Sequence, residues 1–231
     1  MKTIGLIGGM SWESTAHYYA RINRETARHL GGLHSAPLLV SSLDFAPIAA
    51  LQTAGDWDEA GTRLACEAKR LEAAGAEVIG LATNTMHIVA PAIEAALGTA
   101  RFVHIADPTA TALAEDGART VGLLGTRFTM EMDFYRKRLE DAGFAVLVPG
   151  VGHTELNAII FEELCRGIVT DRSRARYVEA IEGLAARGAE AVILGCTEIA
   201  MLVTDDDSPL PLYDTTELHA DALVAAALPG S

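Results

Sequence analysis

Residues 188–200 read GAEAVILGCTEIA, and residues 75–87 read GAEVIGLATNTMH. Both stretches contain an unbroken apolar run that ends at a small reactive or polar side chain, Cys196 in the later copy and Thr83 in the earlier one. A short continuous apolar run bounded by turn residues is typical of a strand that is buried on both faces of a parallel sheet. The chain therefore carries the same strand end twice, with a thiol at one copy and a hydroxyl at the other.

A second pair of similar segments supports an internal repeat. KTIGLIGGM begins at Lys2 and RTVGLLGTR begins at Arg119, 117 positions later, while Cys196 lies 113 positions after Thr83. Because the two offsets differ by only four residues, we expect two halves of similar fold related by a pseudo-twofold axis.

Apolar runs alternate with helical patterns along the whole chain. In residues 57–75, for example, apolar side chains recur every three to four positions and the pattern stops at a glycine. Such alternation predicts an α/β fold, with a mostly parallel sheet flanked by helices in each half. The strands are expected at residues 3–8, 37–43, 76–82, 101–106, 119–125, 145–150, 190–195 and 210–213. We expect residues 1–98 and 214–231 to form the first half, and residues 99–213 the second.

Composition restricts the possible partners. The chain of 231 residues has 31 acidic and 18 basic side chains and a formal net charge of −13, which argues against a nucleic-acid partner. No apolar run approaches the roughly 20 residues that a membrane-spanning helix needs. The apolar run near the N-terminus breaks at Gly8 and Gly9 and is too short for a signal peptide, so we expect a cytoplasmic protein with no membrane partner.

The three cysteines, Cys66, Cys165 and Cys196, match no zinc-binding spacing and are odd in number. Free thiols in a reducing compartment fit this pattern best. We therefore expect no metal site. Cys66 and Cys165 are expected to be packing residues.

Thr83 and Cys196 each follow a strand, where functional groups gather in open parallel sheets. A cleft between the two halves could place them face to face, an arrangement that suits moving a proton off and onto one carbon from opposite sides. A thiolate forms readily near a helix N-terminus. Backbone amides there, with the side chains of Asn84, Thr85 and Thr197, could hold a carboxylate. Cys196 as a small buried packing residue and Thr83 as a helix N-cap remain open alternatives.

Five segments together resemble the aspartate/glutamate racemase family, and in particular its bacterial amino-acid racemase branch. They are IGLIGGMSWEST, ATNTMH, GLLGTRFTM, IIFEELCRG and LGCTEI, spread over nearly the whole chain. The resemblance implies two pseudo-symmetric α/β halves with the active site in the cleft between them, no cofactor, and usually a homodimer. In the family, paired cysteines in C-N-T and G-C-T motifs act as the two bases.

The resemblance also assigns roles to individual positions. Cys196 takes the place of the second cysteine, while Thr83 stands where the first should be and would donate or relay a proton through its hydroxyl. Other positions match residues that bind the substrate or line the site: Met10, Ser11, Asn84, Thr85, Thr126, Thr129 and Thr197. For Ser11 and Thr126, a simple helix-capping role is the alternative.

Four further positions have open interpretations. Gln52 and Cys165 align where some aspartate racemases carry cationic side chains for the distal carboxylate, which leaves neutral groups there. Glu198 could tune Cys196 or bind the substrate's amino group, or it could be an exposed carboxylate at a helix start. His87 could assist the group at position 83, although packing or a supporting hydrogen bond is favoured.

The sequence as a whole predicts a cofactor-independent racemase that interconverts the L and D forms of aspartate, glutamate or both. The expected partner is a small amino acid. One alternative is a decarboxylase of the same superfamily, because arylmalonate decarboxylases also keep only the second-half cysteine. The other is an amino-acid-binding protein without turnover.

Overall fold

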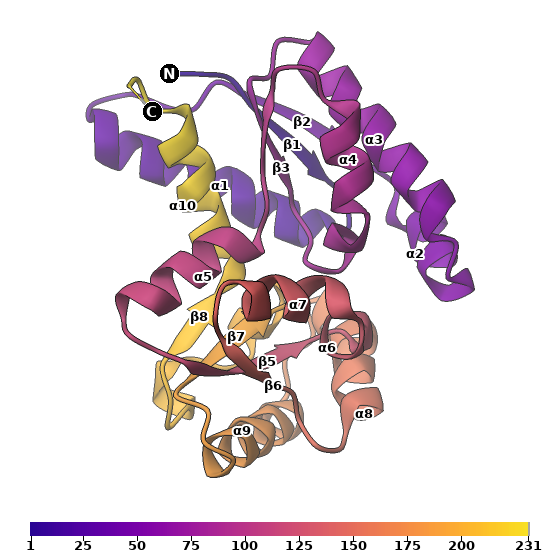
Figure 1. Ribbon diagram of the computed structural model, residues 1–231, viewed down its shortest axis with the longest axis vertical. Coiled ribbons are helices and arrows are strands. Elements are labelled where there is room, and N and C mark those ends of the chain that lie inside the picture. Colours follow the sequence, from indigo (N-terminus) through magenta and orange to yellow (C-terminus); the bar gives the residue numbers. More distant parts are fainter. Residues whose placement is uncertain (231) are drawn as a thin grey trace. The chain divides into compact units, whose positions relative to one another are not determined.

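The computed structural model describes residues 1–230, and the chain divides into two compact units (Figure 1). The first unit contains Met1–Ile105 and the chain from His219 onward, and the second contains Ala106–Leu218. The division expected from the sequence placed the first crossing after residue 98. The first unit instead extends to Ile105, because the strand at residues 101–103 pairs within its sheet.

The first unit contains a four-stranded parallel sheet in the order β2-β1-β3-β4. The strands are β1 (Ile4–Gly8), β2 (Leu38–Ser42), β3 (Val78–Leu81) and β4 (Arg101–Val103). Strand β4 is shorter than the run of residues 101–106 predicted from sequence. The amide of Ile105 donates to the His87 ring instead of continuing the ladder, and the next helix begins at Ala106.

The second unit repeats the arrangement with the strand order β6-β5-β7-β8, again fully parallel. The strands are β5 (Thr120–Gly125), β6 (Ala145–Leu147), β7 (Ala191–Gly195) and β8 (Leu212–Asp214). Each of the eight predicted strands is present, and the predicted class of two parallel α/β sheets is confirmed.

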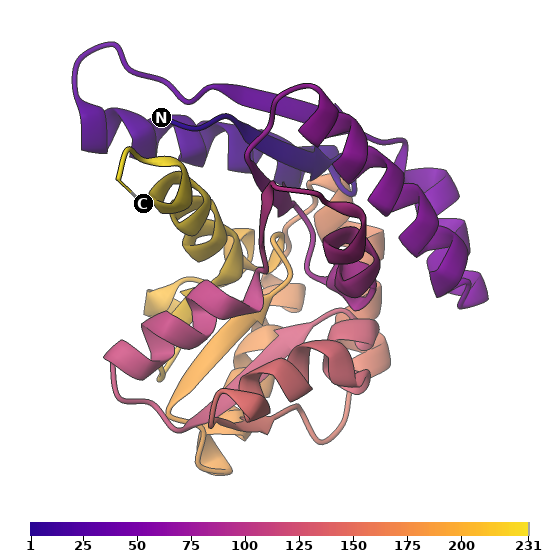
Figure 2. The ribbon, with the colours of Figure 1, turned by 45° about the horizontal axis from the view of Figure 1, so that its top comes forward.

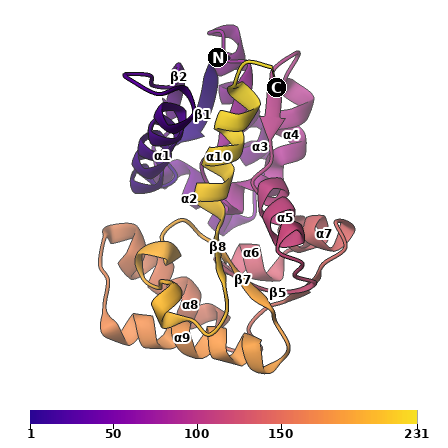
Figure 3. The same ribbon diagram turned by 90° about the vertical axis from the view of Figure 1, so that its left-hand side faces the viewer.

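Helices cover both faces of the first sheet (Figures 2 and 3). They are α1 (Trp12–Leu30), α2 (Phe45–Ala54), α3 (Trp57–Ala73), the 3₁₀ helix η1 (Thr85–Val89), α4 (Ala90–Ala96) and the greater part of α10 (Thr215–Ala227). On one face, Tyr18 of α1 and Leu223 of α10 pack with Leu6. On the other face, Leu64 of α3 packs with Ile7. Alternate residues of β1 are thus buried on opposite faces, as the continuous apolar pattern requires.

The second sheet is covered in the same way. Its helices are α5 (Ala106–Glu115), α6 (Arg127–Glu131), α7 (Asp133–Asp141), α8 (His153–Ala158), the π-helical turn η2 (Ile159–Glu163), η3 (Leu164–Arg166), α9 (Asp171–Ala186), η4 (Ile199–Met201) and η5 (Asp205–Asp207). Tyr177 and Ile181 of α9 pack against Leu124 and Val192 of the sheet. Among the described residues, none of the helices has the length and apolar character needed to cross a membrane.

The loop after β1 is tightly constrained at Gly9. The residue has φ 88°, and a Cβ placed on it would lie 2.1 Å from the carbonyl oxygen of Leu43. Its amide donates to the Thr15 hydroxyl at 2.7 Å, and that hydroxyl donates to the carbonyl of Ser11 at 2.8 Å. Glycine is therefore required here both by the backbone conformation and by the close approach of the Leu43 backbone.

Replacing Gly9 by alanine is expected to destabilise the protein by at least about 2 kcal/mol, since the left-handed conformation alone costs an L-residue roughly 1–2 kcal/mol. The matched control is Gly183→Ala in α9, where an added Cβ meets no atom within 4 Å. That control should gain about 0.5–1 kcal/mol from reduced backbone entropy. Urea denaturation followed by circular dichroism measures both changes, and equal midpoints for the two variants would contradict the argument.

Candidate active site

Thr83 and Cys196 occupy equivalent positions in their respective sheets. Ile7 pairs with Leu81 in the first sheet, and Leu124 pairs with Leu194 in the second. Thr83 and Cys196 each lie two residues beyond the second member of these pairs. The repeat seen in the sequence therefore corresponds to the same register between the two central strands of each unit.

A group of residues in the first unit, which we call the first strand-end cluster, lies at the carboxyl ends of β1 and β3. It consists of Met10, Ser11, Thr83, Asn84 and Thr85, all buried although four of the five are polar. The amide of Ala82 donates to the carbonyl of Ile7 at 2.8 Å, which continues the strand pairing up to the cluster. All five residues had been predicted to line or bind at the site, and the fold brings them to one edge of one sheet.

Two members of the first unit also have structural roles. Ser11 is the N-cap of α1, and its hydroxyl accepts a hydrogen bond from the amide of Ser14 at 3.3 Å. Gln52 in α2 is buried, and its amide nitrogen donates to the sulfur of Met86 at 3.0 Å. Gln52 therefore lies beside η1, which begins at Thr85, whereas Cys165 packs against the core of the second unit.

The second strand-end cluster consists of Thr126, Thr129, Cys196, Thr197 and Glu198. The thiol of Cys196 donates to Oε2 of Glu198 at 3.0 Å, and the hydroxyl of Thr197 donates to the same oxygen at 2.5 Å. Glu198 is buried, unlike the exposed helix-start carboxylate that the sequence left open. One carboxylate oxygen thus joins the thiol and the hydroxyl in a single network.

The Cys196 thiol is held in its protonated form. Burial is the main cause that raises its pKa well above the ordinary value, and the negative charge of Glu198 and the proximity of Cys165 act in the same direction. A readily formed thiolate was expected from a helix N-terminus. The helix that follows is only the three-residue η4, so burial and Glu198 dominate instead.

Thr126 and Thr129 follow β5 beside Cys196, because Gly125 pairs with Gly195. Thr126 is the N-cap of α6 and accepts from the amide of Thr129 at 3.3 Å, while their hydroxyl oxygens are 3.2 Å apart. The capping role left open for Thr126 is therefore present. Both hydroxyls remain at the strand end that carries the thiol.

Sequence reasoning missed three buried residues near the first strand-end cluster. Thr15 bridges Gly9 and Ser11, and His104 and His219 lie close to the ring of His87. His104 lies among apolar residues in FVHIA, whereas His219 lies in TTELHADALVAAA, a helix that also carries acidic residues. Neither stretch indicates from the sequence alone that the two histidines lie near each other.

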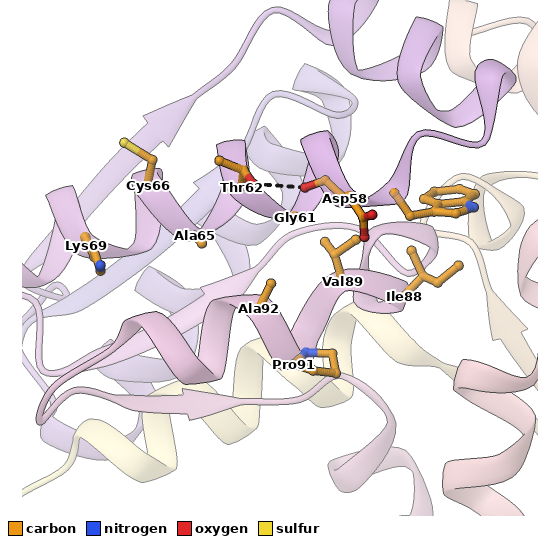
Figure 4. Close-up of a pocket in the computed structure, with 11 residues that line it drawn as sticks. Asp58, Gly61, Thr62, Ala65, Cys66, Lys69, Ile88, Val89, Pro91 and Ala92 are labelled. Carbon is orange, nitrogen blue, oxygen red and sulfur yellow. Dashed lines mark hydrogen bonds between the residues drawn. The ribbon is translucent and has the colours of Figure 1, made fainter.

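A separate groove of about 710 Å³ lies between α3 and the η1–α4 segment (Figure 4). Trp57, Thr62 and Lys69 line one side, and Ile88 and Pro91 line the other. No residue of either strand-end cluster lines it. The groove is therefore distinct from the candidate site.

Known proteins resemble this chain over nearly its full length. Residues 7–223 match the family model Asp/Glu/Hydantoin racemase. An Asp/Glu racemase candidate from Yersinia pestis is 49% identical, with 98% of this chain and 99% of that chain covered and a TM-score of 0.91. An aspartate racemase homologue from Pyrococcus horikoshii OT3 is 36% identical, with 98% and 99% covered and a TM-score of 0.83. An aspartate racemase from Picrophilus torridus is 23% identical, with 98% and 94% covered and a TM-score of 0.77, which shows the fold.

Replacing Glu198 by glutamine should lower the pKa of Cys196, because the change removes a buried negative charge beside the thiol. The measurement is the ultraviolet absorbance of the thiolate against pH, with Cys66 and Cys165 replaced by alanine so that Cys196 is the sole thiol. Glu182→Gln, an exposed position in α9, removes the same charge and should leave the titration unchanged.

The same shift has a consequence for stability. A raised pKa in the folded state means that the thiol's contribution is complete below the ordinary thiol pKa and is lost as the pH rises above it. The Glu198→Gln protein should therefore lose less stability at alkaline pH than the native protein. A thiol pKa that rises in Glu198→Gln would show instead that the carboxyl group favours the thiolate.

Proposed function

We propose, because the chain belongs to the Asp/Glu/hydantoin racemase family, that it is an isomerase that racemises aspartate, glutamate or both without a cofactor. The observation that carries the proposal is the equivalent register of Thr83 and Cys196 in two sheets of the same strand order. Racemisation needs one acid/base group for each face of the α-carbon. Because the two units repeat one fold, each supplies one such group at the equivalent strand end.

The proposed reaction begins with the Cα–H bond of the bound amino acid facing Cys196. Glu198 accepts the thiol proton through the existing 3.0 Å contact, and the resulting thiolate takes the α-proton. A proton then reaches the opposite face of the carbon from Thr83, directly or through water. Solvent returns a proton to the Thr83 side and accepts the proton held by Glu198, which restores both groups. In the reverse direction, Cys196 acts as the acid in the thiol form that burial favours.

The substrate α-carboxylate is assigned to the amides and side chains of Asn84, Thr85 and Thr197. These positions follow β3 and β7, and they supply hydroxyl, amide and backbone N–H donors for a carboxylate. Local donors of this kind are needed because the chain as a whole carries a formal charge of −13 and repels acidic substrates. Met10, Ser11, Gln52, Thr126 and Thr129 are assigned to the remainder of the binding site. The structural relatives fit a small amino acid as the ligand, and we propose a homodimer as the assembly.

Replacing Cys196 by alanine should abolish turnover. In deuterated water, native protein is expected to deuterate the α-carbon of aspartate or glutamate and to racemise it, and both rates should fall at least about 100-fold in Cys196→Ala. NMR follows deuteration and circular dichroism follows optical rotation. Cys66 is exposed in α3, so its predicted packing role is wrong. Cys66→Ala is therefore a suitable control and should retain both rates. Native protein that binds the amino acid without deuterating it would favour a binding protein, and CO₂ release from an arylmalonate would favour a decarboxylase.

Replacing Thr83 by alanine should separate exchange from racemisation. The enantiomer whose α-proton faces Cys196 should still be deuterated, because the thiol exchanges its proton with solvent and returns a deuteron to the same face. Optical rotation should decay at least about 100-fold more slowly. Thr62→Ala in α3, whose hydroxyl bonds only locally to Asp58, serves as the control. Unchanged racemisation in Thr83→Ala would exclude Thr83 as the second acid.

A further inference from the structure

Three buried histidines lie together in the first unit, next to the first strand-end cluster. They are His87 in η1, His104 after β4 and His219 in α10, and each is less than 5% exposed. The ring centroids of His87 and His104 are 4.5 Å apart, and those of His87 and His219 are 5.9 Å apart. The reaction proposed above uses none of them.

The contacts of His87 fix its tautomer. Its Nδ1 lies 2.8 Å from the carbonyl oxygen of Thr83, and a carbonyl only accepts, so Nδ1 carries the proton. Its Nε2 accepts from the amide of Ile105 at 3.2 Å and therefore presents a lone pair. His87 is a neutral ring with a donor on one side and an acceptor on the other.

His219 is held in the opposite tautomer. Its Nε2 donates to the carbonyl of Val103 at 2.8 Å, and its Nδ1 accepts from the hydroxyl of Tyr18 at 2.8 Å. The ring packs at 75° to that of His87. Because both nitrogens of His87 and both of His219 have protein partners, the cluster is not built to ligate a metal.

The bond from His87 to Thr83 takes the place of a backbone bond. The amide of His87 donates to the carbonyl of Asn84 at 3.0 Å, so it is the ring that reaches the carbonyl of Thr83, four residues earlier. The Thr83–Asn84 peptide is trans. In a planar trans peptide, C=O and N–H point in opposite directions. A ring that holds the Thr83 carbonyl therefore directs the Asn84 amide to the side away from His87.

We propose that His87 is a positioning residue for the first strand-end cluster. Its Nδ1–H holds the Thr83 carbonyl, and its Nε2, bonded to Ile105, holds the ring. Together they set the direction of the Thr83 side chain and of the Asn84 amide. The inference rests on the proposed function, in which Thr83 serves one face of the α-carbon and Asn84 contributes to the carboxylate site.

Substitutions at His87 separate the donor from the bulk of the ring. Asparagine places an amide nitrogen near the position of Nδ1 and keeps the donor to Thr83, whereas leucine keeps only apolar volume. Glutamine places its amide near Nε2 and keeps the contact with Ile105 but loses the donor. We expect His87→Asn to racemise within about threefold of the native rate, and His87→Leu and His87→Gln to fall at least about tenfold.

The distinguishing readout is the comparison of the two faces. In deuterated water, the enantiomer whose α-proton faces Cys196 should lose less exchange in His87→Leu than the enantiomer served by Thr83, so the ratio of the two rates should widen. Thermal unfolding of each variant separates a folding defect from a positioning defect. Equal rates and an unchanged ratio in all three variants would overturn the proposal and leave His87 as packing.

A second measurement does not depend on activity. NMR of protein labelled with ¹⁵N should find the ring proton of His87 on Nδ1 and that of His219 on Nε2. In the same spectra, the amide signal of Asn84 should move in His87→Leu but stay near its native position in His87→Asn. A native protein without α-proton exchange would refute the proposed function while this test still decides the role of His87. A proton on Nε2 of His87 instead of Nδ1, or an Asn84 amide signal that is unchanged in both variants, would refute that role.

Discussion

The pairing of β1 with β3, and of β5 with β7, is the constraint on which the rest of the structure depends. All four strands are buried on both faces, and in the first sheet the side chains of β1 and β3 alternate between two separate cores under different helices. A slip of one residue would exchange the two sets of side chains, so the register is strongly specified. The positions of Thr83 and Cys196 are consequences of that register, since each follows its strand after a fixed number of residues.

The two strand ends are alike in backbone and different in chemistry. In the second unit, a buried carboxylate accepts from both the thiol of Cys196 and the hydroxyl of Thr197. In the first unit, the neutral imidazole of His87 holds the carbonyl of Thr83. The two hydrogen-bond partners of this ring described above are backbone groups, not carboxylates. In the proposed reaction, Glu198 gives the Cys196 thiol an acceptor for its proton. The Thr83 hydroxyl has no such partner in the proposal, so its proton transfer depends on how the side chain is directed. In the proposed reaction, this difference in acid/base strength predicts that the two enantiomers are handled at unequal rates.

Features determined by local pattern could be predicted from the sequence, and features determined by contacts between distant segments could not. The eight strands, the repeat and the positions of Thr83 and Cys196 follow from apolar runs and spacing, whereas other strand-end residues, such as Met10 and Thr126, were assigned by the family resemblance. The burial of Glu198 and the raised pKa of Cys196 do not, because both depend on tertiary packing, and Cys196 lies in a core built with residues of α9 and the η2–η3 segment. The end of β4 was also missed, since the amide of Ile105 finds its partner on His87, 18 residues earlier.

The histidine cluster links the first strand end to both connections between the units. The chain leaves the first unit after Ile105 and returns at His219. Ile105 is bonded to His87, and His219 is bonded to Val103, two residues before the point of departure. Ile105 is therefore bonded to the residue that holds the carbonyl of Thr83, whereas His219 is bonded to the end of β4. The residues at which the chain leaves and re-enters the first unit are thus held by contacts inside that unit, and one of these contacts also holds the ring that bonds to the carbonyl of Thr83.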